Sequence, residues 1–331
     1  MSNAQLAIIV PCFNEEQVLP ETARRLESLL SRLETLGKIS TKSKIVFVDD
    51  GSSDRTWLLI EEMARSDSRV EGLKLSRNQG HQNALLAGLL NATGDALVSI
   101  DADLQDDVDA IEEMVDRFLE GYDIVYGVRV ERKTDSAFKR GTAQGYYRLL
   151  KFFGVNIVYN HADFRLMSRR SVEALRQFGE VNLFLRGLIP LLGYNSTSVH
   201  YSRAGRFAGE SKYPLRKMLA LAINGITSFS AVPLRYIAAF GMLVSLVSVG
   251  MVAWVLWVRL FTEMAVPGWA SSVIPIYFIG GIQLLGIGVV GEYLAKLYNE
   301  TKQRPRFFLE KHVGKDLVQD GERLSQESGT N

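Results

Sequence analysis

The sequence predicts an α/β fold with a mostly parallel sheet, followed by two long apolar helices. Short apolar runs alternate with amphipathic helical patterns along the first half of the chain, and several runs end in acidic or polar residues. Farther along, 236–258 and 269–291 are two uncharged apolar stretches of 23 residues each. The 331 residues should therefore divide into a charged N-terminal part and an apolar C-terminal part.

The first two predicted strands cover residues 6–10 and 44–48, and an amphipathic helix over 18–36 connects them. A turn containing Asn14 and Glu15 follows the first strand. An acidic turn follows the second, where Gly51 permits a tight bend and a serine or aspartate can cap the next helix. Strand, turn, helix and strand in this order are typical of a parallel βαβ unit.

Further strands are predicted over residues 70–75, 96–100 and 123–127. A polar turn over 77–82 and a helix over 83–91 follow the first of these strands. Because the carboxyl ends of parallel strands meet at one edge of a sheet, the polar turns should lie close together there.

An acidic stretch follows the strand over 96–100. Asp101, Asp103 and Gln105 alternate along it, so their oxygens can point toward one place at the sheet edge. Two carboxylates and an amide oxygen suit Mg²⁺ or Mn²⁺, with coordination positions left for phosphate oxygens. The alternative is an acidic loop that caps a helix beginning near Val108.

Composition excludes several classes of protein. The only cysteine, Cys12, rules out an internal disulfide framework and fits a reducing compartment. The net charge of +1 gives no sign of a nucleic-acid partner, and the first residues do not resemble a signal peptide. The four histidines lack zinc-ligand spacing and are expected to be ordinary polar residues.

The two apolar stretches are each long enough, at roughly 34 Å, to cross a bilayer. Tryptophan and tyrosine lie toward their ends, and basic residues gather before the first and after the second. We expect a transmembrane hairpin with both chain ends in the cytoplasm; two buried core helices are the alternative. Residues 214–233, with a basic start and apolar spacing, are expected to form a helix at the membrane interface, or else a core helix.

Eight motifs in register resemble family 2 glycosyltransferases, and more narrowly the polyprenyl-phosphate glycosyltransferases, which include dolichol-phosphate mannose synthases and bactoprenol glucosyltransferases. The motifs are Val10-Pro11-x-x-Asn14-Glu15, Val48-Asp49-Asp50-Gly51-Ser52-x-Asp54, Asn78-x-Gly80, Gly94-Asp95, Asp101-Ala-Asp103-Leu-Gln105-Asp106, Tyr126-Gly127-x-Arg129, Asp163-Phe-Arg165-Leu-Met and Arg206-x-x-Gly209-x-Ser211-Lys212-Tyr213. The two-span tail brings the bactoprenol branch closest.

The resemblance implies a GT-A fold, with a Rossmann-like, mostly parallel sheet, and an inverting, metal-dependent transfer of a sugar. The nucleotide pocket would be lined by Pro11, Asn14, Glu15 and Asp50. Asp101 would face the ribose and diphosphate, and the metal ligands would be Asp101, Asp103 and Gln105. A basic loop with Arg206, Ser211 and Lys212 would close over the diphosphate or meet the lipid phosphate.

A further set of residues concerns the acceptor substrate. Asp163 stands where relatives often keep a base or an orienting carboxylate, and both roles stay open. Arg129, Lys133 and Arg140, near a predicted helix over 138–153, are candidates to bind the acceptor phosphate, or they form a basic face toward lipid headgroups. Charge neutralisation matters more here than deprotonation, because a phosphate monoester is already mostly dianionic at neutral pH.

The resulting domain prediction is a cytosolic GT-A domain over 1–213, the interfacial helix over 214–233, the membrane region over 234–300 and a polar cytosolic tail over 301–331. The expected reaction transfers glucose from UDP-glucose to undecaprenyl phosphate at the cytosolic face of a bacterial inner membrane. The donor could instead be GDP-mannose, and the glycine-rich face of the second span would also suit a homo-oligomer.

Two other classes are less compatible with the sequence. A processive synthase should carry a Gln-x-x-Arg-Trp signature, but the comparable region, Asn182-Leu-Phe-Leu-Arg186-Gly187, lacks the tryptophan. A non-catalytic nucleotide-sugar-binding protein should have lost part of the acidic motif, which is intact here.

Overall fold

The structure is a computed structural model, and it describes residues 4–129, 161–180, 183–202, 232–261 and 269–314. The chain forms two compact units. The described residues of the first unit lie before residue 203 and again from 303 to 314, and those of the second lie within 232–302.

The first unit is built on one eight-stranded sheet, with the strand order β7-β5-β6-β4-β1-β2-β3-β8. Within the described residues, only β6 and β8 run antiparallel to their neighbours. The strands are β1 (Leu6–Cys12), β2 (Lys44–Asp49), β3 (Val70–Leu75), β4 (Ala96–Ser99), β5 (Ile124–Arg129), β6 (His161–Ser168), β7 (Ser196–Tyr201) and β8 (Leu309–Val313). The predicted α/β fold with a mostly parallel sheet is confirmed.

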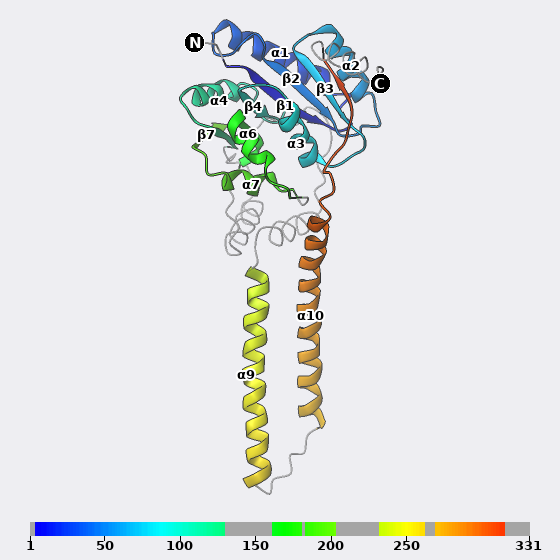
Figure 1. Cartoon of the computed structure of the whole chain (residues 1–331), viewed down its shortest axis with the longest axis vertical. Coiled ribbons are helices and arrows are strands. Elements are labelled where there is room, and N and C mark those ends of the chain that lie inside the picture. The colour runs from blue at the N-terminus through cyan, green and yellow to red at the C-terminus, as the bar shows by residue number, and fades with distance from the viewer. Residues whose placement is uncertain (1–3, 130–160, 181–182, 203–231, 262–268, 315–331) are drawn as a thin grey trace, which may run out of the picture. The chain divides into compact units, whose positions relative to one another are not determined.

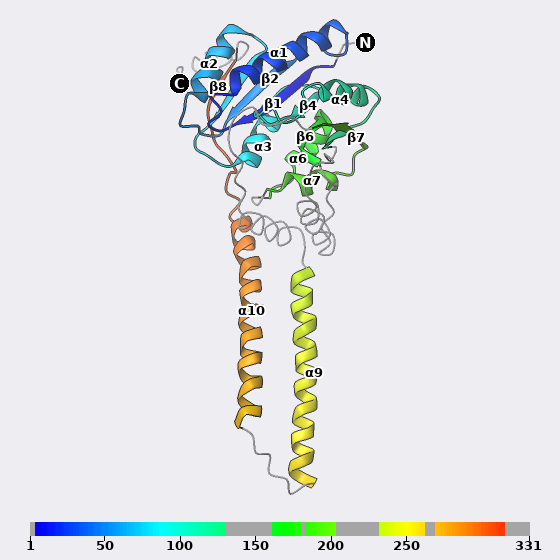
Figure 2. The same ribbon diagram turned by 180° about the vertical axis from the view of Figure 1, so that it is seen from behind.

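Helices cover both faces of this sheet, as Figures 1 and 2 show for the first unit. Ile8 of β1 belongs to the buried cluster that includes the leucines of α1, whereas Ile9 points to the opposite face. There it meets α3 at Gly88, where an added Cβ would stand 2.3 Å from a methyl carbon of Ile9. The helices of this unit are α1 (Leu19–Thr35), α2 (Thr56–Ser66), α3 (His81–Asn91), α4 (Ala110–Leu119), α6 (Arg169–Arg176) and α7 (Leu185–Leu191).

The chain returns to the first sheet near its C-terminal end. The sequence predicts a polar tail over 301–331, but residues 309–313 of that segment form β8, which pairs antiparallel with β3. An ion pair joins Lys74 Nζ to the Glu310 carboxylate at 3.0 Å. Glu310, Lys311 and His312 are polar in succession, so these five residues lack the alternation of polar and apolar residues from which a strand is predicted.

The second unit contains two long helices, α9 (Val232–Phe261, 30 residues) and α10 (Trp269–Thr301, 33 residues), drawn side by side in Figures 1 and 2. They include the two predicted apolar stretches. Between them lies a groove of about 1210 Å³, in which Gly286 faces Ile237. Among the residues that the structure describes, no helix combines the length and the apolarity needed to cross a membrane. The two spans stay a prediction.

Three predicted features lie outside the described residues. They are most of the interfacial helix over 214–233, the helix over 138–153 and the tail beyond residue 314.

Candidate active site

The predicted nucleotide and metal residues gather at one edge of the sheet. The parallel strands β1, β2 and β4 end at Cys12, Asp49 and Ser99, and the loops that follow them carry the residues in question. This edge is where open α/β sheets hold their ligands. The structure therefore brings together residues from three motifs that lie far apart in the sequence.

Hydrogen bonds join the loop after β1 to the residues that follow β2. Asn14, which has a left-handed φ of 56°, accepts a hydrogen bond from the Ser53 amide on its side-chain oxygen at 2.9 Å. The Glu15 amide in turn donates to Thr56 Oγ1 at 2.9 Å. Asn14 is exposed and Glu15 is half-buried, whereas Pro11 is buried within β1. Asn14 and Glu15 thus face the rim of the site, and Pro11 shapes the strand beneath it.

Asp50 braces the loop between β3 and α3. Its buried carboxylate accepts hydrogen bonds from the amides of Gln79 at 2.7 Å and Gly80 at 2.9 Å. Burial raises the pKa of Asp50 above its ordinary value, although the two amides oppose that effect. Both oxygens are thus engaged by the protein, so the immediate task of Asp50 is to fix the turn that leads into α3.

The acidic loop after β4 is tightly folded. Leu104 is held at a left-handed φ of 56°, and the Gln105 amide donates to Asp103 Oδ1 at 3.1 Å. A non-glycine residue in this region is uncommon and is often found at functional sites. The loop therefore keeps Asp103 and Gln105 in a fixed relation to each other.

The donor atoms of the acidic loop fit a divalent cation shared with substrate. The Gln105 side chain is buried, and its Nε2 has no hydrogen-bond partner among the described residues. A 180° turn of the amide would put an oxygen ligand at that position. Burial, together with the charges of Asp106, Asp163 and Asp103, raises the pKa of Asp101, and a cation would offset this excess negative charge.

A complete protein cage for a metal is not preformed. Within the described part of the chain, no three histidine, cysteine, aspartate or glutamate side chains converge closely enough to hold a metal ion. The predicted set has two carboxylates and one amide, so it would need oxygens from the substrate to complete the coordination.

Asp106 ties the acidic loop to two strand ends. Its Oδ1 accepts hydrogen bonds from Tyr201 Oη at 2.5 Å and from Arg129 Nη2 at 3.0 Å. Arg129 is a predicted ligand of the acceptor phosphate, but in the structure its guanidinium is engaged by this buried carboxylate. Its observed contacts stabilise the loop.

Asp163 lies at the centre of a second charged cluster. It projects from β6, which pairs antiparallel with β4 so that Arg165 stands opposite Ser99. Asp163 Oδ1 lies 2.6 Å from Arg165 Nη2, and its Oδ2 lies 3.0 Å from Arg186 Nη2. His81 Nε2 stands between two carboxylates, 3.6 Å from Asp163 and 3.4 Å from Asp101.

These neighbours determine the charge of Asp163. Burial raises its pKa, but His81, Arg165 and Arg186 outweigh that effect and hold the pKa well below its ordinary value. A carboxylate in this state is a weak proton acceptor at neutral pH. Of the two roles left open by the sequence, the geometry favours an orienting carboxylate over a base.

The sequence does not identify His81 and Arg186 as site residues. His81 is expected to be an ordinary polar residue, yet it begins α3 directly after the Asn78-x-Gly80 motif, at the end of a parallel strand. Its place directly after that motif is the sequence feature that could have identified His81 as a site residue. Arg186 lies 23 residues from Asp163 in the sequence, and only the fold shows that the two side chains meet.

Five predicted residues lie outside the described ranges, and their positions are therefore not given by the structure. They are Lys133, Arg140, Arg206, Ser211 and Lys212.

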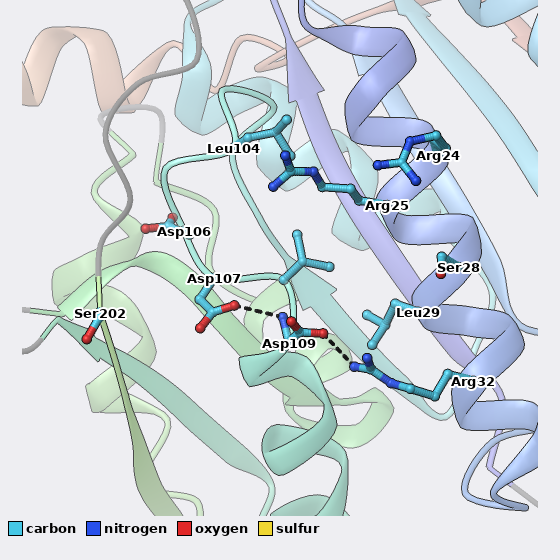
Figure 3. Close-up of a pocket in the computed structure, with 11 residues that line it drawn as sticks. Arg24, Arg25, Ser28, Leu29, Arg32, Leu104, Asp106, Asp107, Asp109 and Ser202 are labelled. Carbon is cyan, nitrogen blue, oxygen red and sulfur yellow. Dashed lines mark hydrogen bonds and ion pairs between the residues drawn. The ribbon is translucent and has the colours of Figure 1, made fainter.

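Figure 3 shows a pocket lined by α1 and by the acidic loop. Its volume is about 540 Å³. The α1 residues Arg24, Arg25 and Arg32 line one side of it, and Leu104, Asp106 and Asp107 come from the loop. Arg32 pairs with Asp109 at 2.6 Å, while Arg24 and Arg25 both bind Glu21. Asp101 and Asp103 are not among its lining residues, so this pocket is separate from the candidate metal ligands.

The chain is similar to a known protein family and to several known proteins. Residues 7–176 match the model of the family described as glycosyl transferase family 2. The uncharacterized glycosyltransferase YkoT of Bacillus subtilis is 49% identical, over 93% of this chain and 92% of its own. A prophage bactoprenol glucosyl transferase homolog of Escherichia coli is 40% identical, over 93% of this chain and 99% of its own.

Among solved structures, mannosyl-3-phosphoglycerate synthase from Rubrobacter xylanophilus is similar at 16% identity and a TM-score of 0.46, over 82% of this chain and 80% of its own.

Proposed function

This chain belongs to glycosyl transferase family 2, and from that premise we propose that it transfers a sugar from a nucleotide diphosphate sugar to a polyprenyl phosphate. The observation that carries the proposal is that Asn14 follows β1 and that Asp101, Asp103 and Gln105 follow the neighbouring strand β4, at the carboxyl edge of the sheet. The name of the 40% identical relative from Escherichia coli supports bactoprenol phosphate as acceptor and glucose as the sugar. UDP-glucose is therefore the proposed donor, with inversion at the sugar.

Asp101, Asp103 and Gln105 would hold Mg²⁺ or Mn²⁺ together with the donor diphosphate. A divalent cation at this position neutralises charge on the leaving diphosphate. Asn14 and Glu15, fixed by their bonds to the loop after β2, are suited to contact the nucleoside. The remaining phosphate ligands in this proposal are Lys133, Arg140, Arg206, Ser211 and Lys212.

The acceptor does not need a strong base. A phosphate monoester is mostly dianionic at neutral pH and is already a nucleophile. The low pKa of Asp163 agrees with a site that orients and neutralises its acceptor rather than deprotonating it.

We further propose that α9 and α10 are embedded in a bilayer as a hairpin, with both chain ends on the cytoplasmic side. Large apolar side chains along both helices are exposed, including Trp254 at 60%, Trp257 at 62% and Ile276 at 67%. Many exposed large apolar side chains on one pair of helices are typical of a surface that contacts lipid or protein. A polyprenyl substrate is itself confined to the membrane, so lipid is the expected environment.

The membrane proposal is tested by flotation and labelling. The full-length protein should float with liposomes and resist extraction at alkaline pH. A cysteine placed within residues 262–268 should react with an impermeant thiol reagent added outside intact spheroplasts, with Cys12 replaced by serine. Labelling of that position only after the membrane is opened would contradict the proposed orientation.

The central test is a transfer assay. Purified full-length protein in detergent is given undecaprenyl phosphate, Mg²⁺ or Mn²⁺ and a panel of labelled nucleotide sugars, and label is extracted into the lipid phase. We expect label from UDP-glucose, and loss of that label when a chelator is added. Label from GDP-mannose alone would identify a mannosyl transferase. Nucleotide-sugar binding without transfer from any donor would favour a binding protein.

A further inference from the structure

One arginine of the site lacks an assigned role. Arg186, on α7, presents one edge of its guanidinium to Asp163, with Nε 3.2 Å from Oδ1 and Nη2 3.0 Å from Oδ2. Asp163 also binds Arg165, whose side chain is 1% exposed, whereas the Arg186 side chain is 37% exposed. Of the two guanidinium groups on this carboxylate, one is therefore structural and the other reaches the surface of the site.

The position of Arg186 is fixed on both sides. Asp163 binds its guanidinium. The backbone amide of the preceding residue, Leu185, donates a hydrogen bond to Gln82 Oε1 on α3 at 3.0 Å. Since His81 begins α3 and lies near both Asp101 and Asp163, Arg186 belongs to the same edge of the sheet as the acidic loop. An arginine held in this way is preorganised, because its rotamer entropy has already been lost.

Around Asp163 itself, positive side chains outnumber the carboxylate. Two arginines bind Asp163, and His81 Nε2 lies 3.6 Å from it and 3.4 Å from Asp101. A guanidinium carries five N–H donors in a planar arrangement that matches the oxygens of a phosphate, and the Arg186 side chain is partly exposed.

We propose that Arg186 is a phosphate-binding residue of the transfer reaction and that Asp163 is the carboxylate that positions it. The inference rests on the proposed function, because both substrates of that reaction carry phosphate. The bound group is either the phosphate monoester of the lipid acceptor or the diphosphate of the donor. The recognition chemistry is the same for both, and kinetics distinguish them.

The test measures steady-state transfer from UDP-glucose to undecaprenyl phosphate by full-length Arg186→Gln and Arg186→Lys in detergent. Removing a charge-assisted hydrogen bond should raise the KM of the substrate concerned, or lower kcat, by about 10- to 100-fold. Arg186→Lys should recover part of the loss, because lysine keeps the charge but not the planar fork.

The matched control is Arg117→Gln. The Arg117 side chain is 40% exposed and pairs with Glu120 at 3.0 Å, but both residues belong to the surface of α4 and its C-terminal end. This variant should keep wild-type kinetics. Melting temperatures of all variants separate a loss of binding from a loss of folding.

The outcomes distinguish the two phosphate sources. A raised KM for undecaprenyl phosphate with an unchanged affinity for UDP in calorimetry assigns Arg186 to the acceptor. Weaker UDP binding assigns it to the donor. Unchanged KM and kcat in a folded Arg186→Gln protein would overturn the inference while leaving the proposed function intact. Absence of transfer by the wild-type protein would overturn both.

The positioning role of Asp163 has its own readout. Asp163→Asn should impair the same kinetic parameter as Arg186→Gln, and the double variant should be no worse than the more impaired single variant, because the two residues act as a unit. Losses that multiply in the double variant would show that Asp163 acts independently of Arg186, and would overturn that part of the inference.

Discussion

At the scale of single residues, the carboxylates of the site differ in how the protein satisfies them. Asp50 is bound by two backbone amides and Asp106 by Tyr201 and Arg129. Asp101 lies 3.4 Å from His81, and the nearby charges of Asp106, Asp163 and Asp103 add to desolvation in raising its pKa. Asp101 and Asp106, in the same loop, therefore have different surroundings, and a cation would relieve the negative charge around Asp101.

This difference predicts the outcome of two substitutions in the same loop. Asp103→Ala should lower the transfer rate by about 100-fold or more while the protein stays folded, because a proposed ligand of the diphosphate-bound cation is lost. Asp107→Ala is the control, since Asp107 is exposed and its side chain binds only the Asp109 amide in the described structure. Rates are measured over a range of Mg²⁺ concentrations. Equal rates for Asp103→Ala and Asp107→Ala would place the metal site elsewhere.

At the scale of elements, the loops between strands and helices carry the chemistry, and their geometry depends on a few contacts. Gly51 has a φ of +69°, and an added Cβ would stand 2.6 Å from the Asn78 amide nitrogen. The β2–α2 loop therefore touches the backbone of the β3–α3 loop directly. Gly51 serves both the turn and this close approach.

Gly51→Ala should therefore lower the free energy of unfolding by more than the strain of a left-handed φ alone would. Gly37→Ala is the matched control, because Gly37 has a φ of +67° with no atom within 4 Å of an added Cβ. We expect Gly37→Ala to lower the free energy of unfolding by about 1 kcal/mol. Gly51→Ala should cost more and should also raise the KM of the donor. Chemical unfolding and donor kinetics measure both effects, and equal losses in the two variants would contradict the argument.

The sequence predicted the elements whose periodicity is strong and local. β3 was predicted at its observed bounds, and α1 within one residue at each end, because apolar residues recur there at regular spacing. The acidic loop was found because its residues are consecutive. His81 and Arg186 were missed because their relation to Asp163 exists only between α3, α7 and β6, and no local pattern encodes a contact of that kind.

The antiparallel pair of β3 and β8 contains a buried charge that gives stability a pH dependence. Glu71 on β3 binds Lys44 Nζ at 2.5 Å and lies 3.7 Å from His312 of β8. Burial raises the pKa of Glu71, but the bonds from His312 and Lys44 outweigh it, so the pKa lies below its ordinary value. A lowered folded-state pKa contributes stability above the unfolded value, near 4.3, and that contribution is lost as pH falls through the folded value.

Glu71→Gln should therefore lower the melting temperature at pH 7, since it leaves Lys44 buried without its carboxylate partner. The difference between the variant and the wild type should begin to shrink below about pH 4.3 and should disappear as the pH falls through the lower folded-state pKa, where the folded wild-type carboxylate becomes protonated. Thermal unfolding at pH 7, 5 and 4 provides the measurement. A difference that grows as the pH falls would contradict the sign of the linkage.

At the scale of the whole molecule, the chain leaves the first unit, forms the helix pair and returns to complete the first sheet. β8 covers the edge of β3 with backbone hydrogen bonds and brings the side chain of Val313 onto the core. An uncovered edge strand exposes unpaired backbone groups and favours association between chains. The last described residues are therefore part of the fold of the first unit.

Ending the chain after Phe308 should lower the melting temperature by about 5 °C and promote aggregation, because β3 becomes an edge. Ending it after Gly314 keeps β8 and should leave both properties unchanged. Thermal unfolding and light scattering compare the two truncated proteins in detergent. Equal behaviour would show that β8 adds nothing to the stability of the sheet.

The place of β8 in the chain also has a consequence for synthesis on the ribosome. Seven strands of the sheet are made before α9 and α10, and the eighth is made after them. The helix pair therefore leaves the ribosome while the β3 edge is still open. Closure of that edge by residues 309–313 occurs only when translation is almost finished, so the order of synthesis delays completion of the sheet until the helix pair has been made.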